Sequence, residues 1–169
     1  MNIIGIDHGN AQTKTVRFSF ASGVAEYEHE PFTSRSVLEY NGKYYVCGTG
    51  RQPLTLDKTI TETYYLLTLA AVAKEIEARS MPRTCTIIIA AGLPLTTYGR
   101  EKNKFMSYLV RGGDAVSFRY EGKPYEITVS GAYIFPQGYS AILEHRDMLL
   151  GEPSVILADI GGWTVDVLR

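Results

Sequence analysis

The sequence of 169 residues is long enough for one domain, or one lobe of a larger protein, with a buried hydrophobic core. Hydrophobic residues make up 45% of the chain and charged residues 21%, which is typical of a globular protein and argues against extended disorder. The 17 Lys and Arg residues and 18 Asp and Glu residues leave a net charge of −1, so we expect no direct binding of nucleic acid.

The N-terminal residues, MNIIGIDHGN, lack the basic segment of a signal peptide, and no apolar run approaches the roughly 18 residues of a membrane-spanning helix. Cys47 and Cys85 lie far apart and outside any metal-binding motif, so we expect two reduced thiols. The sequence therefore predicts a cytoplasmic protein without a membrane contact.

Short strands are expected at the start of the chain. An apolar run over 2–7 and alternating residues over 13–20 predict a β-hairpin at 2–20, with its turn at Gly9-Asn10. A strand over 24–32 would complete a three-stranded meander.

A second hairpin is predicted over 36–48, because Asn41-Gly42 is a strong signal for a two-residue hairpin turn. We place it in a small β-rich insertion at about residues 33–58. The tyrosines of this region are compatible with either an interface or the core of the insertion.

Helices and further strands follow. Helical spacing over 59–80 puts Leu66, Leu69 and Ile76 on one face, with Lys74, Glu75, Glu77 and Arg79 mainly outside it. The β-branched run over 85–91 is typical of a strand covered on both faces, and 98–110 reads as a second helix.

The last third of the chain predicts a hairpin over 115–129, a helix over 137–150 and a second strand pair over 154–169. We expect the strand at 154–159 to be buried in a central mixed sheet with the first meander and 85–91. The fold class predicted is α/β, with helices packed on the sheet.

Two segments share one pattern, in which an apolar strand ends in Asp and a Gly-containing turn leads to a strand that opens with Thr. The first is Asp7-His8-Gly9-Asn10 before Thr13 and Lys14, and the second is Asp159-Ile160-Gly161-Gly162 before Thr164 and Asp166. Glycine-rich turns let backbone N–H groups point together at an anion, so two such turns can bind a polyphosphate from opposite sides.

Carboxylates repel phosphates, but they suit a hydrated Mg2+ that bridges phosphate oxygens. Asp7 and Asp159 are therefore candidate metal-side residues, and Lys14 can supply a positive charge to the phosphates. For either segment alone, an ordinary hairpin with Asp at the turn stays an open alternative.

The two segments resemble the phosphate 1 and phosphate 2 motifs of the actin, heat-shock chaperone and sugar-kinase superfamily, in the same order and about 150 residues apart. Ala91-Gly92-Leu93-Pro94-Leu95 and Phe135-Pro136-Gln137-Gly138 resemble segments of the ParM/StbA-like plasmid-segregation actins. The resemblance implies the N-terminal lobe of an actin-like, ribonuclease H-like ATPase that takes ATP or GTP with Mg2+.

The resemblance also implies roles for individual residues. Gln137 lies 22 residues before Asp159, where the superfamily has a Gln or Glu near the attacking water, so Gln137 and Asp159 are the candidate catalytic residues. Trp163 departs from the small polar residue usual at its position. The candidate metal residues are Asp7, Asp159 and Asp166, and the candidate nucleotide-binding residues are Asp7, Gly9, Asn10, Thr13, Lys14, Gly161, Gly162 and Thr164.

The function implied is that of a filament-forming ATPase, which associates with itself and segregates plasmid DNA through an adaptor DNA-binding protein. A metabolic kinase of the same superfamily and a truncated, non-catalytic interaction module are the alternatives. The family continues into a second lobe with an adenosine motif, which has no counterpart here. We therefore expect residues 1–169 to be inactive alone, as the lobe of an active parent protein.

Overall fold

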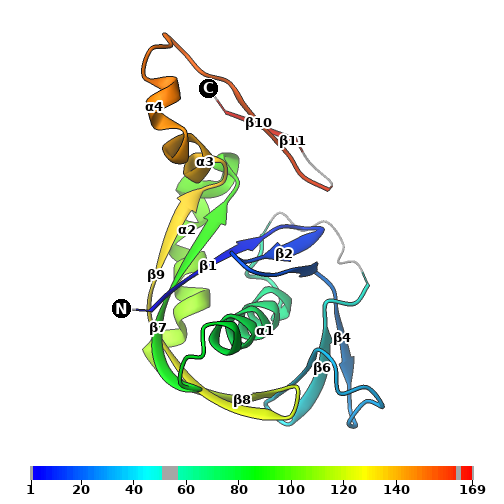
Figure 1. Ribbon diagram of the computed structural model, residues 1–169. Coiled ribbons are helices and arrows are strands. Elements are labelled where there is room, and N and C mark those ends of the chain that lie inside the picture. The colour runs from blue at the N-terminus through cyan, green and yellow to red at the C-terminus, as the bar shows by residue number, and fades with distance from the viewer. Residues whose placement is uncertain (1, 51–56, 163–164, 169) are drawn as a thin grey trace.

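The computed structural model describes residues 2–50, 57–162 and 165–168, in which six strands precede the first helix and further helices and strands follow (Figure 1). The helices are α1 (Thr63–Ala78), α2 (Leu95–Val110), α3 (Tyr139–Glu144) and α4 (Arg146–Leu149), with a 3-10 turn, η1, at Arg111–Gly113. The strands are β1 (Ile3–His8), β2 (Gln12–Lys14), β3 (Ser19–Ala21), β4 (Val24–Tyr27), β5 (Val37–Tyr40), β6 (Lys43–Cys47), β7 (Thr84–Leu93), β8 (Ala115–Tyr120), β9 (Lys123–Pro136), β10 (Leu157–Ile160) and β11 (Val165–Leu168).

Nine of these strands form one mixed sheet in the order β3-β2-β1-β7-β9-β8-β5-β6-β4. The pairs β1–β7 and β7–β9 are parallel, whereas the other neighbours are antiparallel. The sheet curves around α1, which lies on its concave side (Figure 1). The predicted α/β class, a mixed sheet flanked by helices, is confirmed.

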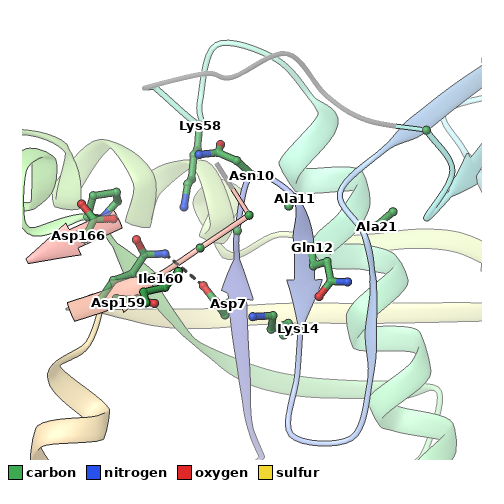
Figure 2. Close-up of a pocket in the computed structure, with 16 residues that line it drawn as sticks. Asp7, Asn10, Ala11, Gln12, Lys14, Ala21, Lys58, Asp159, Ile160 and Asp166 are labelled. Carbon is green, nitrogen blue, oxygen red and sulfur yellow. Dashed lines mark hydrogen bonds between the residues drawn. The ribbon is translucent and has the colours of Figure 1, made fainter. Parts of the chain in front are cut away.

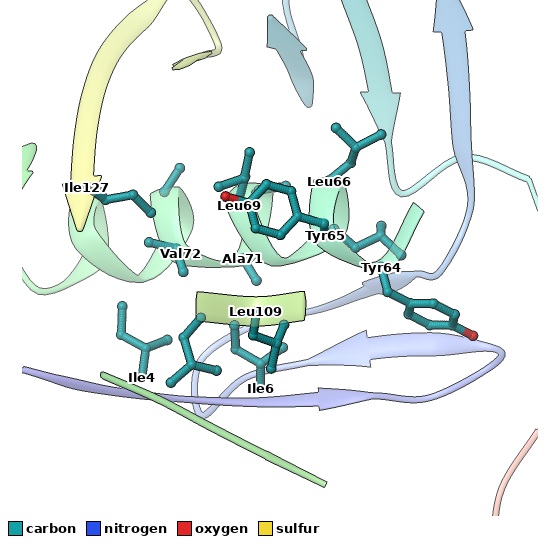
Figure 3. Packing of buried hydrophobic residues seen from close by; sticks show 14 of the residues in the cluster. Ile4, Ile6, Tyr64, Tyr65, Leu66, Leu69, Ala71, Val72, Leu109 and Ile127 are labelled. Carbon is teal, nitrogen blue, oxygen red and sulfur yellow. The ribbon is translucent and has the colours of Figure 1, made fainter. Parts of the chain in front are cut away.

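The core lies between α1 and the concave side of the sheet (Figure 3). Every second residue of β1 and β7 is buried, including Ile4, Ile6, Ile87 and Ile89, whereas most residues between them are partly or well exposed. Burial with this period marks a strand with one covered face, so the prediction that β7 is covered on both faces is wrong. Its continuous apolar run could not distinguish the two cases.

Helix α2 joins the same core. Tyr108 accepts a hydrogen bond from the Tyr65 backbone N–H at 2.7 Å and donates one to the Thr61 carbonyl at 2.7 Å, and Phe105 and Leu109 are fully buried. These contacts fix the start of α1 against α2, next to the carboxyl ends of β1 and β7.

The opening strands differ from the predicted meander. The segment 13–20 is split between β2 and β3 by a reversal in which the Thr15 N–H donates to the Phe18 carbonyl at 2.8 Å. β4 then pairs with β6 instead of β3, so the predicted third strand of the meander is wrong. The Asn41-Gly42 turn is confirmed: both residues have positive φ, at 52° and 74°, and the β5–β6 hairpin extends the sheet through β8.

The C-terminal part differs most from expectation. The predicted helix over 137–150 is divided into α3 and α4, and β10 pairs with β11 in a separate two-stranded sheet. The prediction that 154–159 is buried in the central sheet is wrong, because β2 and β7 occupy both edges of β1, and Ile156 is 68% exposed. Among the helices in the described part of the chain, none is long and apolar enough to cross a membrane.

Candidate functional site

A cavity of about 650 Å3 lies where the β1–β2 turn faces the β10–β11 turn (Figure 2). Its volume lies in the range of about 300–1,000 Å3 that is common for small-molecule sites. The cavity brings together most of the residues predicted from the two sequence motifs: Asp7, Gly9, Asn10, Lys14, Gln137, Asp159, Gly161, Gly162 and Asp166. Segments about 150 residues apart in the sequence thus share one site.

The two turns approach each other closely enough to require glycine. A Cβ atom on Gly162 would lie 2.5 Å from the Cβ of Ala11, which is closer than real Cβ contacts allow. Gly138 has a φ of 80°, and a Cβ there would overlap the Leu157 side chain, so it lets the β10–β11 hairpin pack against the end of β9. Gly162 thus permits the close approach of the two turns, and the positive φ of Gly138 favours glycine where β9 ends.

Strand β1 points its last residues to opposite faces. Asp7 lies exposed and in register with Lys14 of β2, so both side chains face the cavity. His8 is fully buried, and its Nε2 lies 2.7 Å from Thr68 Oγ1. Burial, with the nearby Lys58 charge, lowers the pKa of His8 to about 3, so the imidazole is neutral.

Hydrogen bonds on the side opposite the cavity hold the turn between β1 and β2 in place. Thr13 is fully buried on the face of β2 that points away from the cavity, where its hydroxyl lies 2.9 Å from Ser22 Oγ. Ser22 in turn donates to the Gly9 carbonyl at 2.6 Å. Asn10 accepts a hydrogen bond from the Tyr64 hydroxyl at 2.9 Å, which ties the turn to α1. Thr13 thus lies within the protein and does not line the cavity.

Gln137 lies in the turn between β9 and α3. Its backbone N–H donates to the Leu93 carbonyl at 2.8 Å, and its side-chain Nε2 donates to Asp7 Oδ1 at 3.2 Å, the bond drawn as a dashed line in Figure 2. It precedes α3 by two residues, so it stands just outside the helix start that the sequence indicated. The amide is therefore fixed beside the carboxylate at the end of β1.

The acidic residues of the cavity suit a cation. Asp159 and Asp166 are opposite each other in the β10–β11 ladder, where like charges are unfavourable unless something positive lies between or beside them. Within residues 2–50, 57–162 and 165–168, no three acidic, His or Cys side chains are grouped closely enough to hold a metal ion by themselves. Mg2+ commonly uses one or two carboxylates, waters and substrate phosphates, so the residues fit that mode of binding.

Lys58 is a cavity residue that the sequence reasoning missed. It is only 4% exposed and precedes α1. Burial lowers the pKa of Lys58 to about 8, although the carboxylates of Asp7, Asp166 and Glu101 act in the opposite direction. A lysine in a polar segment reads as a surface residue, and the only local signal is the turn formed by its neighbours Asp57 and Thr59. Thr164 and Trp163 lie outside the described residues.

Residues 5–139 match the family of actin-like protein N-terminal domains. No curated protein matches the sequence. Among solved structures, the actin-like protein Alp7A is similar with a TM-score of 0.75 and 18% identity, over 99% of this chain and 56% of that chain.

Two further structures show the same fold. The archaeal actin homologue Ta0583 in complex with ADP has a TM-score of 0.73 and 20% identity, over 99% of this chain and 55% of that chain. The AlfA filament bound to AMPPNP has a TM-score of 0.73 and 22% identity, over 99% and 64%. The chain thus spans between about half and two thirds of the length of these structures. Because the family match runs from β1 to the start of α3, the chain belongs to the family of actin-like protein N-terminal domains.

Proposed function

We propose that this chain binds the phosphates of a Mg-nucleotide and forms the N-terminal part of an actin-like ATPase that assembles into filaments and segregates plasmid DNA. The observation that carries the proposal is the meeting of two glycine-containing turns, at Gly9 and Gly161-Gly162, around one cavity. The complexes of Ta0583 with ADP and of the AlfA filament with AMPPNP support nucleotide binding by proteins of this fold.

In this proposal the phosphates lie between the two turns. Backbone N–H groups of the turns donate to phosphate oxygens, and Lys14 adds a positive charge from β2. Asp7, Asp159 and Asp166 would hold Mg2+ through its water ligands, and the ion would neutralise charge on the phosphate oxygens. ATP and GTP are both compatible with these residues, because the residues are assigned to the phosphates and Mg2+, which the two nucleotides share.

Gln137 is the residue we assign to the attacking water. Its Nε2 donates to Asp7, so its Oε1 is the amide atom that can accept a hydrogen bond from a water molecule. A neutral amide orients water without removing its proton, which is the task of the glutamine in other nucleotide hydrolases. A kinase of the same superfamily would instead use a carboxylate to accept the proton of its substrate hydroxyl.

The cellular role follows from the resemblance to ParM/StbA-like actins and from the charge of the chain. With a net charge of −1, the chain lacks the cationic field for direct DNA binding, so an adaptor protein would connect the filament to plasmid DNA in the cytoplasm. Filaments would form by self-association of the full-length protein, as the AlfA filament illustrates for a protein of this fold.

Phosphate release and light scattering, measured together on the full-length protein with Mg·ATP and Mg·GTP, test the proposal. We expect nucleotide-dependent scattering and release of phosphate without any added acceptor. Turnover that requires a small hydroxyl compound would favour the kinase alternative. Nucleotide-independent scattering without phosphate release would favour a non-catalytic interaction module.

A further inference from the structure

Lys58 stands out because it is a buried lysine on the wall of a polar cavity. It comes from the segment before α1, which is separate from both glycine-containing hairpins, and its side chain reaches the cavity beside Asn10 (Figure 2). An ammonium group withdrawn from water is unfavourable unless charged or polar groups compensate for the lost hydration. Packing alone therefore gives no reason for a lysine at this position.

The backbone around Lys58 is held in place. Asp57 Oδ1 accepts hydrogen bonds from the Thr59 N–H at 2.9 Å and from the Thr59 hydroxyl at 2.7 Å, and Asp57 Oδ2 accepts one from Lys104 Nζ at 2.6 Å. The Lys58 Nζ itself lies 5.8 Å from the centre of the Tyr64 ring, whose hydroxyl donates to Asn10. The side chain is thus directed toward the first turn by a fixed segment of chain.

The charges of the cavity also favour a phosphate-binding role for Lys58. Three carboxylates line it, those of Asp7, Asp159 and Asp166, and among the described lining residues Lys14 and Lys58 are the cations. The neighbouring His8 is buried and neutral, so it adds no positive charge. With Lys14 as the one lysine, the three carboxylates and the proposed Mg2+ would only balance, whereas Lys58 gives the wall a net positive charge toward a polyphosphate.

We propose that Lys58 is a further phosphate-binding residue, whose ammonium group contacts the terminal phosphate of the bound nucleotide. Lys14 reaches the phosphates from β2, and Lys58 reaches them from the segment before α1. The contact is a charge-assisted hydrogen bond, and the burial of Lys58 keeps water away from the lysine side of the site. This assignment rests on the proposed function and names a residue that neither phosphate motif contains.

The test is nucleotide binding by the full-length Lys58→Met variant, with the exposed Lys102→Met as the matched control. Isothermal titration calorimetry with Mg·ATPγS, Mg·ADP and AMP compares the two with wild type. We expect Lys58→Met to weaken binding of the triphosphate about tenfold or more, to affect the diphosphate less and to leave AMP unchanged. Lys102→Met should match wild type throughout, and Lys58→Arg should recover part of the lost affinity.

Thermal unfolding without nucleotide separates this role from a purely structural one. Removing a buried ammonium group should leave the melting temperature of the free protein unchanged or raise it, while the increase caused by Mg·ATPγS becomes smaller. A structural role predicts a lower melting temperature with an intact nucleotide response. Lys58→Gln serves as the second neutral variant if Lys58→Met does not fold. If a neutral variant binds the triphosphate as tightly as wild type, the assignment of Lys58 is wrong but the proposed function stands. If the wild-type protein binds no nucleotide, both the proposed function and the assignment of Lys58 are wrong.

Discussion

Replacement of Glu75 by Ala should destabilise the fold more than the loss of any other charged side chain of α1. The Glu75 side chain is fully buried and receives hydrogen bonds from the Thr15 hydroxyl at 2.7 Å, Arg79 Nε at 2.7 Å and Arg17 Nη1 at 2.9 Å. Burial by itself would raise the pKa of Glu75, but these hydrogen bonds hold the pKa below its usual value. The carboxylate therefore joins the β2–β3 reversal, next to Lys14, to α1.

The magnitude follows from these contacts. Arg17 and Arg79 keep 45% and 23% of their side-chain surfaces exposed, so their guanidinium groups regain water when the carboxylate is removed. The loss is then smaller than that of a fully buried ion pair, and we expect a decrease of about 3 kcal/mol in the free energy of unfolding. Because a domain of this size loses about 3 °C per kcal/mol, the melting temperature should fall by about 9 °C.

Thermal and urea unfolding of this chain, followed by circular dichroism, measure the effect. Glu77→Ala is the matched control: it lies two residues away and is 33% exposed, and its partners Arg83 and Lys123 are about half exposed. Exposed ion pairs contribute about 0–1 kcal/mol, so the control should change little. A Glu75→Ala variant as stable as Glu77→Ala would refute the reasoning that the buried carboxylate anchors the hairpin.

Other predictions concern the cavity and the response to acid. In the full-length protein, Gln137→Ala should slow phosphate release while light scattering on Mg·ATP stays near wild type, whereas Asp159→Ala should reduce both, since it removes a metal-side carboxylate. Gly162→Ala should weaken nucleotide binding measured by calorimetry, because its Cβ would meet Ala11, and adding Ala11→Gly should restore part of it. Hydrogen bonds from Arg83 and Lys123 lower the pKa of Glu77 to about 2 from 4.5. Its stabilising effect, no more than about 1 kcal/mol because the ion pairs are partly exposed, is present above about pH 4.5 and lost toward pH 2. Acid titration of Glu77→Gln should therefore show a shallower loss of stability than wild type.

Local sequence patterns predicted the elements that short-range chemistry determines. The Asn41-Gly42 turn, the apolar spacing of α1 and the two Asp-Gly turns all follow from neighbouring residues, and one cavity is lined by most of the residues singled out at the two Asp-Gly turns. The turns were recognisable because glycine permits a close backbone approach that the Cβ atom of any larger residue blocks.

What the sequence could not predict depends on tertiary contacts. Glu75 reads as a solvent-facing residue of an amphipathic helix, yet Arg17, 58 residues earlier, buries it. Lys58 likewise reads as exposed, and only the packing of its segment against the cavity reveals its burial. The pairing of β4 with β6 skips the nearest strand, and no periodicity within β4 encodes that choice.

The central claim is that the two facing turns bind nucleotide phosphates. Structure determination of the full-length protein with Mg·AMPPNP tests it most directly. We expect the phosphates to lie in the cavity, between the turn at Gly9 and the turn at Gly161-Gly162, with Lys14 in contact and Gln137 facing the terminal phosphate. Nucleotide bound elsewhere on the protein, with the cavity between the turns empty, would contradict it.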